Sequence, residues 1–133
     1  ILAWLAEAGL ANVLPPLLLD VSRNDWPAQQ FDGVFSANTT HIMSWPAVES
    51  MFTGIGAVLE TGGLLCLYGP FNYRGTYSSD SNARFDQWLK QRDPNSGIKD
   101  VAELTQWAEQ SGLSLAEDYE MPANNRILVW VKQ

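Results

Sequence analysis

The amino-acid sequence predicts an α/β domain with a mostly parallel β-sheet that ends in an antiparallel hairpin. Short apolar runs typical of strands alternate with stretches in which apolar residues recur at helical spacing. The last two apolar runs instead follow each other directly, with no helix between them. Alternating strands and helices give parallel strands, because each helix carries the chain back across the sheet, whereas consecutive strands pair as a hairpin.

The composition indicates a single folded domain. The chain has 133 residues, of which 46% are hydrophobic and only 17% are charged, against about 25% charged in typical soluble domains. No apolar run approaches the roughly 20 residues of a membrane span. The net charge of −7 and the scattered basic residues argue against nucleic acid as a partner. The single cysteine, Cys66, excludes an internal disulfide and fits a reducing, cytoplasmic location.

The first half of the chain predicts one helix end, three strands and a complete helix. Ile1–Gly9 is typical of the end of an amphipathic helix with Gly9 as its C-cap. Leu17–Asp20 and Phe31–Ala37 are predicted strands, the second buried on both faces. A helix is expected from Trp45 to the paired glycines Gly62–Gly63, and Leu64–Tyr68 is the third predicted strand.

The second half predicts two helices followed by the closing hairpin. Gly69–Asp80 is rich in turn residues, and Ser81–Arg92 is predicted to be helical. Asp100–Ser111 is the best-marked helix, because Asp100 can cap its first turn. Leu113–Met121 alternates like a half-exposed edge strand, and Ile127–Val131 is apolar on both faces like a central strand.

The stretch from Phe31 to Phe71 resembles the middle of class I S-adenosylmethionine-dependent methyltransferases. FDGVFSA corresponds to a buried strand of that fold, and the turn Leu59–Gly63 resembles its "LKPGG" turn, with Thr61 at the usual proline position. The segments SANTTHIMSWPAVE, GGLLCLYGPFNY, SNARFDQWLKQRDP and MPANNRILVW are similar to those of one bacterial group, domain of unknown function family 938. The resemblance covers essentially the whole chain.

This resemblance implies a Rossmann-like class I methyltransferase fold that uses S-adenosylmethionine and acts on a small-molecule substrate. Such folds bind the cofactor with a Gly-rich turn after the first strand and an acidic residue at the end of the second. Neither feature precedes Leu17, and the chain begins at Ile1 partway into a helix. We therefore expect a single incomplete domain, the truncated C-terminal two-thirds of the fold, which is inactive when alone.

The resemblance also implies cofactor-binding residues after two strands. Asp20, followed by Val21, ends the first visible strand, where an acidic residue of the family often accepts the adenine amino group. The alternative is a solvated carboxylate at a strand end. Asn38 and Thr39 follow the next strand, at the sheet edge where ligands of open α/β sheets bind.

His41, the only histidine, is the candidate catalytic residue. An imidazole in the loop after Ala37 can act as a general base. The alternative is a polar loop with a structural histidine. One histidine without partner residues does not define a metal site, so no metal is expected.

Five further residues are candidates for contact with the substrate. Four of them belong to the third strand or follow it, at the same edge of the sheet as Asn38. They offer aromatic faces and one amide to a ligand: Tyr68, Phe71, Asn72 and Tyr73. Arg84 accompanies the apolar face of the next helix, either lining the pocket or lying on the surface.

The expected truncation leaves strands without neighbours. In the family the sheet order is 3-2-1-4-5-7-6, so Leu17–Asp20 has no partner in this chain and Phe31–Ala37 becomes an exposed edge. Such an edge invites pairing with a second copy, and we expect self-association there or a rearrangement of the first 30 residues.

Three functions fit these features. A small-molecule methyltransferase is supported by the strand–loop–helix layout and by the polar loop at Asn38–His41. A non-catalytic binding or interaction module with the same fold is the alternative, because fold does not fix function. A nicotinamide-dependent oxidoreductase is less consistent with the closing antiparallel hairpin.

Overall fold

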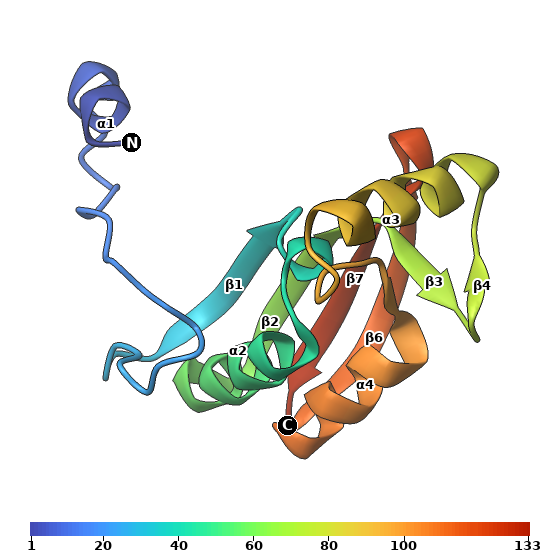
Figure 1. The fold of residues 1–133 in the computed structure, drawn as a ribbon. Helices are drawn as coiled ribbons and strands as arrows, with labels where there is room; N and C mark the ends of the chain where they lie inside the picture. The colour runs from blue at the N-terminus through green and yellow to red at the C-terminus, as the bar shows by residue number, and fades with distance from the viewer.

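The protein, described over residues 1–133 by a computed structural model, has an α/β fold built on a four-stranded mixed sheet (Figure 1). The strands lie in the order β1 (Phe31–Ala37), β2 (Leu59–Gly69), β7 (Asn125–Lys132) and β6 (Leu113–Met121). The predicted α/β class and the closing hairpin are confirmed. None of the helices is both long and apolar enough to cross a membrane.

Only one pair of strands in this sheet is parallel. β1 runs parallel to β2, whereas β7 is antiparallel to both β2 and β6. The expectation of a mostly parallel sheet is therefore not confirmed. The physical reason is the hairpin: β6 leads through a short 3-10 helix (Pro122–Asn124) into β7, which inserts between β6 and β2.

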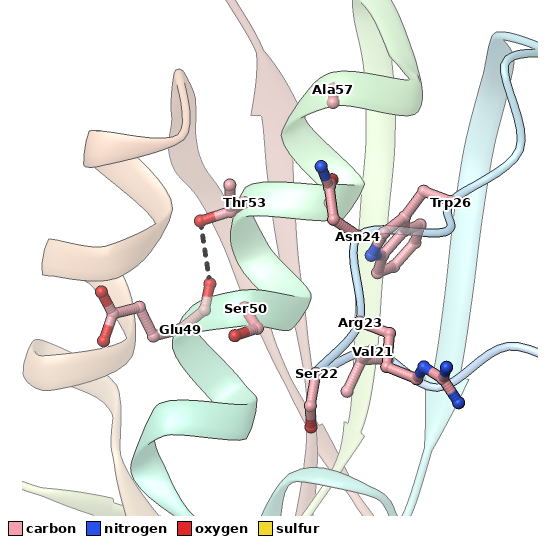
Figure 2. A pocket seen from close by; sticks show the side chains of 10 residues that line it. Val21, Ser22, Arg23, Asn24, Trp26, Glu49, Ser50, Thr53 and Ala57 are labelled. Carbon is pink, nitrogen blue, oxygen red and sulfur yellow. Dashed lines mark hydrogen bonds between the residues drawn. The ribbon is translucent and has the colours of Figure 1, made fainter.

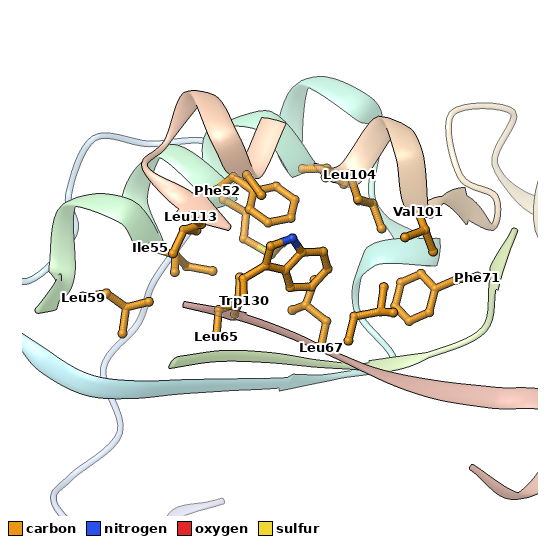
Figure 3. Packing of buried hydrophobic residues seen from close by; sticks show 14 residues of the cluster. Phe52, Ile55, Leu59, Leu65, Leu67, Phe71, Val101, Leu104, Leu113 and Trp130 are labelled. Carbon is orange, nitrogen blue, oxygen red and sulfur yellow. The ribbon is translucent and has the colours of Figure 1, made fainter. Parts of the chain in front are cut away.

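Two helices cover one face of the sheet and enclose the core. α2 (Trp45–Val58) and α4 (Val101–Gln110) lie side by side over the strands in Figure 1. Between helices and sheet lies a cluster of 14 buried apolar residues, with Trp130 of β7 at its centre in Figure 3. The Trp130 indole meets the Phe52 ring of α2 edge-to-face, with 5.7 Å between ring centroids. This burial, about 1.5–3 kcal/mol for each large side chain, holds the helices on the sheet.

The helix α2 ends earlier than the sequence pattern predicts. It stops at Val58, and β2 begins at once with Leu59, so the expected helix end at Gly62–Gly63 is wrong. Leu59 already pairs with Phe31, and the strand register shifts between Phe31 and Gly33. The extra residues of β2 are accommodated in this irregularity, where Gly62 has a φ of 83° that favours glycine.

The turn-rich segment after β2 contributes a second, three-stranded sheet. Its order is β4 (Thr76–Tyr77), β3 (Phe71–Tyr73) and β5 (Lys99–Asp100). Helix α3 (Asp80–Arg92) follows β4 and starts where the Ser79 hydroxyl accepts a hydrogen bond from the Asn82 amide. The turn-rich segment Gly69–Asp80 thus contains two short strands.

The first 20 residues form an arm that stands away from the sheet (Figure 1). Helix α1 (Leu2–Ala8) ends at Gly9 with a φ of 58°, as predicted, but buries none of its residues. The predicted strand at Leu17–Asp20 is wrong. These residues are exposed, Leu18 completely, because no neighbouring strand offers the backbone hydrogen bonds that a strand requires.

Strand β1 is an edge of the sheet, because it pairs with β2 on one side only. Its Phe35 side chain is 67% exposed. An exposed edge with an apolar face can template pairing with another chain.

We therefore expect the 133-residue chain to self-associate through β1. Light scattering at micromolar concentration should show a dimer or a larger species, and Phe35→Lys should shift it to monomer, since a charge on the edge opposes pairing. Tyr119→Lys, on the opposite edge strand β6, is the matched control and should leave the association intact. A folded wild-type monomer would contradict this expectation.

A buried carboxylate fastens α3 to the loop that precedes β5. Asp86 is 1% exposed and accepts hydrogen bonds from Tyr77 Oη at 2.6 Å, Lys90 Nζ at 2.6 Å and the Ile98 amide at 2.7 Å. Burial alone would raise the pKa of Asp86, but these donors outweigh it and lower the pKa. The carboxylate is thus ionised in the folded protein.

We predict that Asp86→Asn lowers the free energy of unfolding by about 2 kcal/mol, because an amide cannot accept from all three donors. Since the pKa of Asp86 is lowered by folding, this stabilisation is present above the ordinary carboxyl pKa and is lost as the pH falls through the folded-state value. Urea unfolding of Asp86→Asn and of Glu60→Gln, an exposed control, measures the difference. Equal stability of the two variants would refute the structural role.

Candidate functional site

The carboxyl ends of β1 and β2 bring several of the predicted site residues together. Asn38 follows β1, and its backbone amide donates a 2.8 Å hydrogen bond to the carbonyl of Tyr68 in β2. Asn38 has a φ of 57°, a left-handed conformation that asparagine tolerates better than most residues. This conformation turns the chain out of the strand and into the 3-10 helix η1 (Thr40–Ile42).

Gly69 leaves space between the side chains of this turn. A Cβ atom at Gly69 would lie 3.7 Å from His41 Nδ1 and 3.9 Å from Asn38 Oδ1. The imidazole and the amide oxygen therefore both face the end of β2. We call Asn38, His41, Tyr68 and Gly69 the strand-end cluster.

His41 is a buried histidine with a free ring nitrogen. It is 5% exposed, its ring meets Phe85 edge-to-face with 5.3 Å between centroids, and its Nδ1 has no hydrogen-bond partner. Burial and the positive charge of Lys99 lower the pKa of His41 below 6.5. The imidazole is therefore neutral at neutral pH, in the protonation state that a general base needs.

Thr39 stabilises the turn after β1 through a side-chain contact with the strand. Its hydroxyl lies 2.6 Å from the hydroxyl of Ser36 near the end of β1. This contact ties the loop to the strand.

Asp20 and Val21 lie apart from the strand-end cluster. Asp20 is exposed, and its Oδ1 accepts a hydrogen bond from the Ser22 amide within a local turn. Val21 lines a cavity of about 270 Å³ between the loop of residues 21–26 and α2 (Figure 2). In that loop Trp26 packs so closely on α2 that any side chain at Gly54 would overlap it. No hydrogen bond joins this loop to Asn38–His41.

Two of the candidate substrate residues have structural contacts. Phe71 is fully buried in the core cluster. The hydroxyl of Tyr73 donates a 2.7 Å hydrogen bond to Asp118 of β6, whose other oxygen accepts from Arg126 Nε at 2.8 Å. Tyr73 thereby links the small sheet to the closing hairpin.

The other substrate candidates lie in different places. Tyr68, a member of the strand-end cluster, is partly exposed, and Arg84 is exposed on α3 without an ion pair. Asn72 lines a separate cavity of about 610 Å³ between the small sheet and the loop before β5, and its buried Oδ1 has no hydrogen-bond partner.

The sequence pattern missed Lys99, which lines this second cavity and is 3% exposed. A lone lysine before a helix cap normally indicates a solvated side chain, so no local signal distinguishes it. The buried Asp86 was missed for the same reason. No group of three or more histidine, cysteine or acidic side chains is placed to hold a metal ion.

Several solved structures of methyltransferases have a similar fold. The mitomycin 7-O-methyltransferase MmcR is 17% identical, with a TM-score of 0.82 over 98% of this chain and 38% of that protein. An O-methyltransferase family 2 protein from Planctomyces limnophilus DSM 3776 is 15% identical, with a TM-score of 0.75 over 86% of this chain and 33% of that protein. CalO1, a methyltransferase in calicheamicin biosynthesis, is 16% identical, with a TM-score of 0.65 over 77% of this chain and 30% of that protein.

These similarities show a class I methyltransferase-like fold, and the chain spans about a third of the length of these proteins. One family model, described as "Protein of unknown function (DUF938)", matches residues 1–132. The match extends over all seven strands and four α-helices, from α1 to the end of β7. The chain therefore belongs to the DUF938 family, as its sequence segments predict.

Proposed function

We propose that the protein to which this chain belongs is an S-adenosylmethionine-dependent methyltransferase with a small-molecule acceptor. The observation that carries this proposal is the strand-end cluster, in which Asn38 and His41 face the end of β2 next to a glycine. Ligands of open α/β sheets bind at the carboxyl ends of parallel strands, and β1 and β2 are such a pair. CalO1, with a similar fold, was solved in a form with bound SAH.

The strand-end cluster suits part of such a cofactor site. The Asn38 amide offers a donor and an acceptor, and the missing side chain of Gly69 leaves room beside them. The Gly-rich turn of class I methyltransferases has no counterpart in these 133 residues. When bound, S-adenosylmethionine supplies a methyl group on a sulfonium centre.

His41 supplies the base in this proposal. A hydroxyl acceptor must lose its proton as it becomes a nucleophile, and we assign that proton to the neutral imidazole, whose Nδ1 is buried and has no hydrogen-bond partner in the protein. Catalysis otherwise depends on positioning the acceptor, and Tyr68 remains a predicted contact for this role. Asp20, Val21, Thr39, Phe71, Asn72, Tyr73 and Arg84 remain predicted contacts, of which Phe71 is the least accessible.

We predict that His41 titrates below pH 6.5. Because His41 is the only histidine, its imidazole gives a single set of NMR signals whose pH dependence reports its pKa directly. Lys99→Met should raise this pKa towards 6.5 by removing a nearby positive charge, whereas Lys132→Met, near the C-terminus, should leave it unchanged. A wild-type pKa at or above 6.5 is incompatible with a buried neutral base.

The lowered pKa of His41 also affects the free energy of unfolding. Since folding lowers the pKa of His41, the unfolded chain binds more protons between the folded-state value and 6.5. The contribution of His41 to the free energy of unfolding should therefore be constant above pH 6.5 and should decrease as the pH falls below it. His41→Gln should remove this pH dependence in urea unfolding experiments.

We predict that the protein, with any residues that precede Ile1 in its gene, binds S-adenosylhomocysteine with micromolar affinity. Asn38→Gly keeps the left-handed backbone but removes the amide, and it should weaken binding about tenfold. Asn95→Gly, in an exposed turn, is the matched control. Isothermal titration calorimetry measures all three proteins.

Absence of binding by the wild-type protein would contradict the methyltransferase proposal and favour a non-catalytic binding module with the same fold. Equal binding by Asn38→Gly and the wild type would contradict the assigned role of the strand-end cluster. We expect the 133-residue chain alone to show no measurable binding.

A further inference from the structure

Lys99 in β5 is a buried cation without an acidic partner. Its Nζ atom donates 2.8 Å hydrogen bonds to the backbone carbonyls of Met43 and Gly97 and lies 5.4 Å from the centre of the Trp45 ring. The ammonium group has three protons, and these two carbonyls accept only two of them. Apart from the cation–π contact with Trp45, the protein thus leaves one donor of this buried positive charge without an acceptor.

The nearby carboxylates are engaged elsewhere. Asp86 forms its ion pair with Lys90, and both oxygens of Asp100 accept backbone amides, from Ala102 at 2.9 Å and from Gly75 at 2.7 Å. No carboxylate lies within ion-pair distance of Lys99 Nζ. Burying an unpaired charge is costly, so the surroundings of Lys99 favour an added anion.

The cavity beside Lys99 is large enough for a small molecule. Its volume is about 610 Å³, within the range of roughly 300–1,000 Å³ for ligand pockets. Asn72 also lines it, in the strand adjacent to β5, and the buried Asn72 Oδ1 lacks a donor. Trp45 contributes an aromatic side chain. The charged residues that line the cavity besides Lys99 are Arg74 and Lys90, which are positive, and Asp100 and Glu103, which are negative.

We propose that this cavity binds a small organic carboxylate that also carries a hydroxyl group. Its carboxylate is the missing counter-ion of Lys99, and its hydroxyl is the missing donor for Asn72 Oδ1. The proposal does not depend on methyl transfer, because Lys99 and its two carbonyl partners lie outside the strand-end cluster, and it assigns Asn72, a predicted substrate contact, to this cavity instead. The two sites are nonetheless neighbours, since the carbonyl of His41 accepts a 2.9 Å hydrogen bond from the Gly97 amide of the cavity wall.

The proton on Lys99 provides a direct signature of this binding. Burial lowers the pKa of Lys99 to about 8. Asp86 and Asp93, in α3 and at its end, and Glu103 in α4 raise this pKa, whereas Lys90 in α3 lowers it, and the nearby His41 of η1 is neutral at this pH. An anion beside the ammonium group raises that pKa again. Binding above pH 8 must therefore take up a proton and weaken as the pH rises.

The test is calorimetry with 4-hydroxybenzoate as the probe. The wild-type chain should bind 4-hydroxybenzoate at about pH 7. Proton uptake is measured with benzoate at about pH 9, because benzoate has no phenol that titrates in this range, and it is detected as a dependence of the binding heat on buffer ionisation enthalpy. The neutral analogue 4-hydroxybenzamide should bind at least about tenfold more weakly, because it cannot pair with the charge.

Two variants separate the roles of the two side chains. Lys99→Met, of similar volume, should weaken both 4-hydroxybenzoate and benzoate about tenfold and abolish proton uptake. Asn72→Ala should weaken 4-hydroxybenzoate but leave benzoate unchanged. Lys132→Met is the matched control, and circular dichroism verifies that each variant is folded.

The proposal is overturned if the wild type does not bind 4-hydroxybenzoate, if the amide binds equally well, or if benzoate binding occurs without proton uptake at about pH 9. The wild-type measurements decide the matter even if Lys99→Met fails to fold. Because none of them involves S-adenosylhomocysteine, their outcome is independent of that of the methyltransferase proposal.

Discussion

The parallel pairing of β1 with β2 is the constraint on which the rest of the molecule depends. It places Ala37 beside Tyr68, so the chain leaves both strands at the same edge of the sheet. The pair is held from one face by α2 and α4 across the core around Trp130. Because β1 has no second neighbour, its position relies on this single ladder and on the packing of partly buried Val34 against the core.

Three ionisable side chains are buried near that edge, and their charges are compensated to different extents. Asp86 remains charged because three donors surround it, whereas His41 is kept neutral by burial and by the charge of Lys99. Lys99 has backbone carbonyls but no counter-ion. A group whose charge is fully compensated stabilises the fold, and a group left incompletely compensated is a candidate for binding or proton transfer. By this criterion His41 and Lys99 are functional candidates, and Asp86 is structural.

Local signals in the sequence predicted the elements that depend on local interactions. Gly9 and Asp100 end and begin helices as expected, because a left-handed C-cap and a side-chain N-cap involve only neighbouring residues. Leu17–Asp20 has the composition of a strand but forms none, since strand formation requires a partner that composition does not reveal. The rule that ligands bind at the carboxyl ends of parallel strands drew attention to Asn38 and His41. The burial of Lys99 instead depends on how β5 packs beside β3, which is far away in sequence.

Hydrogen–deuterium exchange of the protein, with any residues preceding Ile1, tests the central claim most directly when it is measured with and without S-adenosylhomocysteine. The account predicts that the ligand slows exchange at residues 38–42 and 68–70, where the two strands end. Exchange at residues 109–115, near the opposite end of the strands, should remain unchanged. Added protection confined to the latter segment, or none at residues 38–42, would contradict the placement of a cofactor site at the carboxyl ends of β1 and β2.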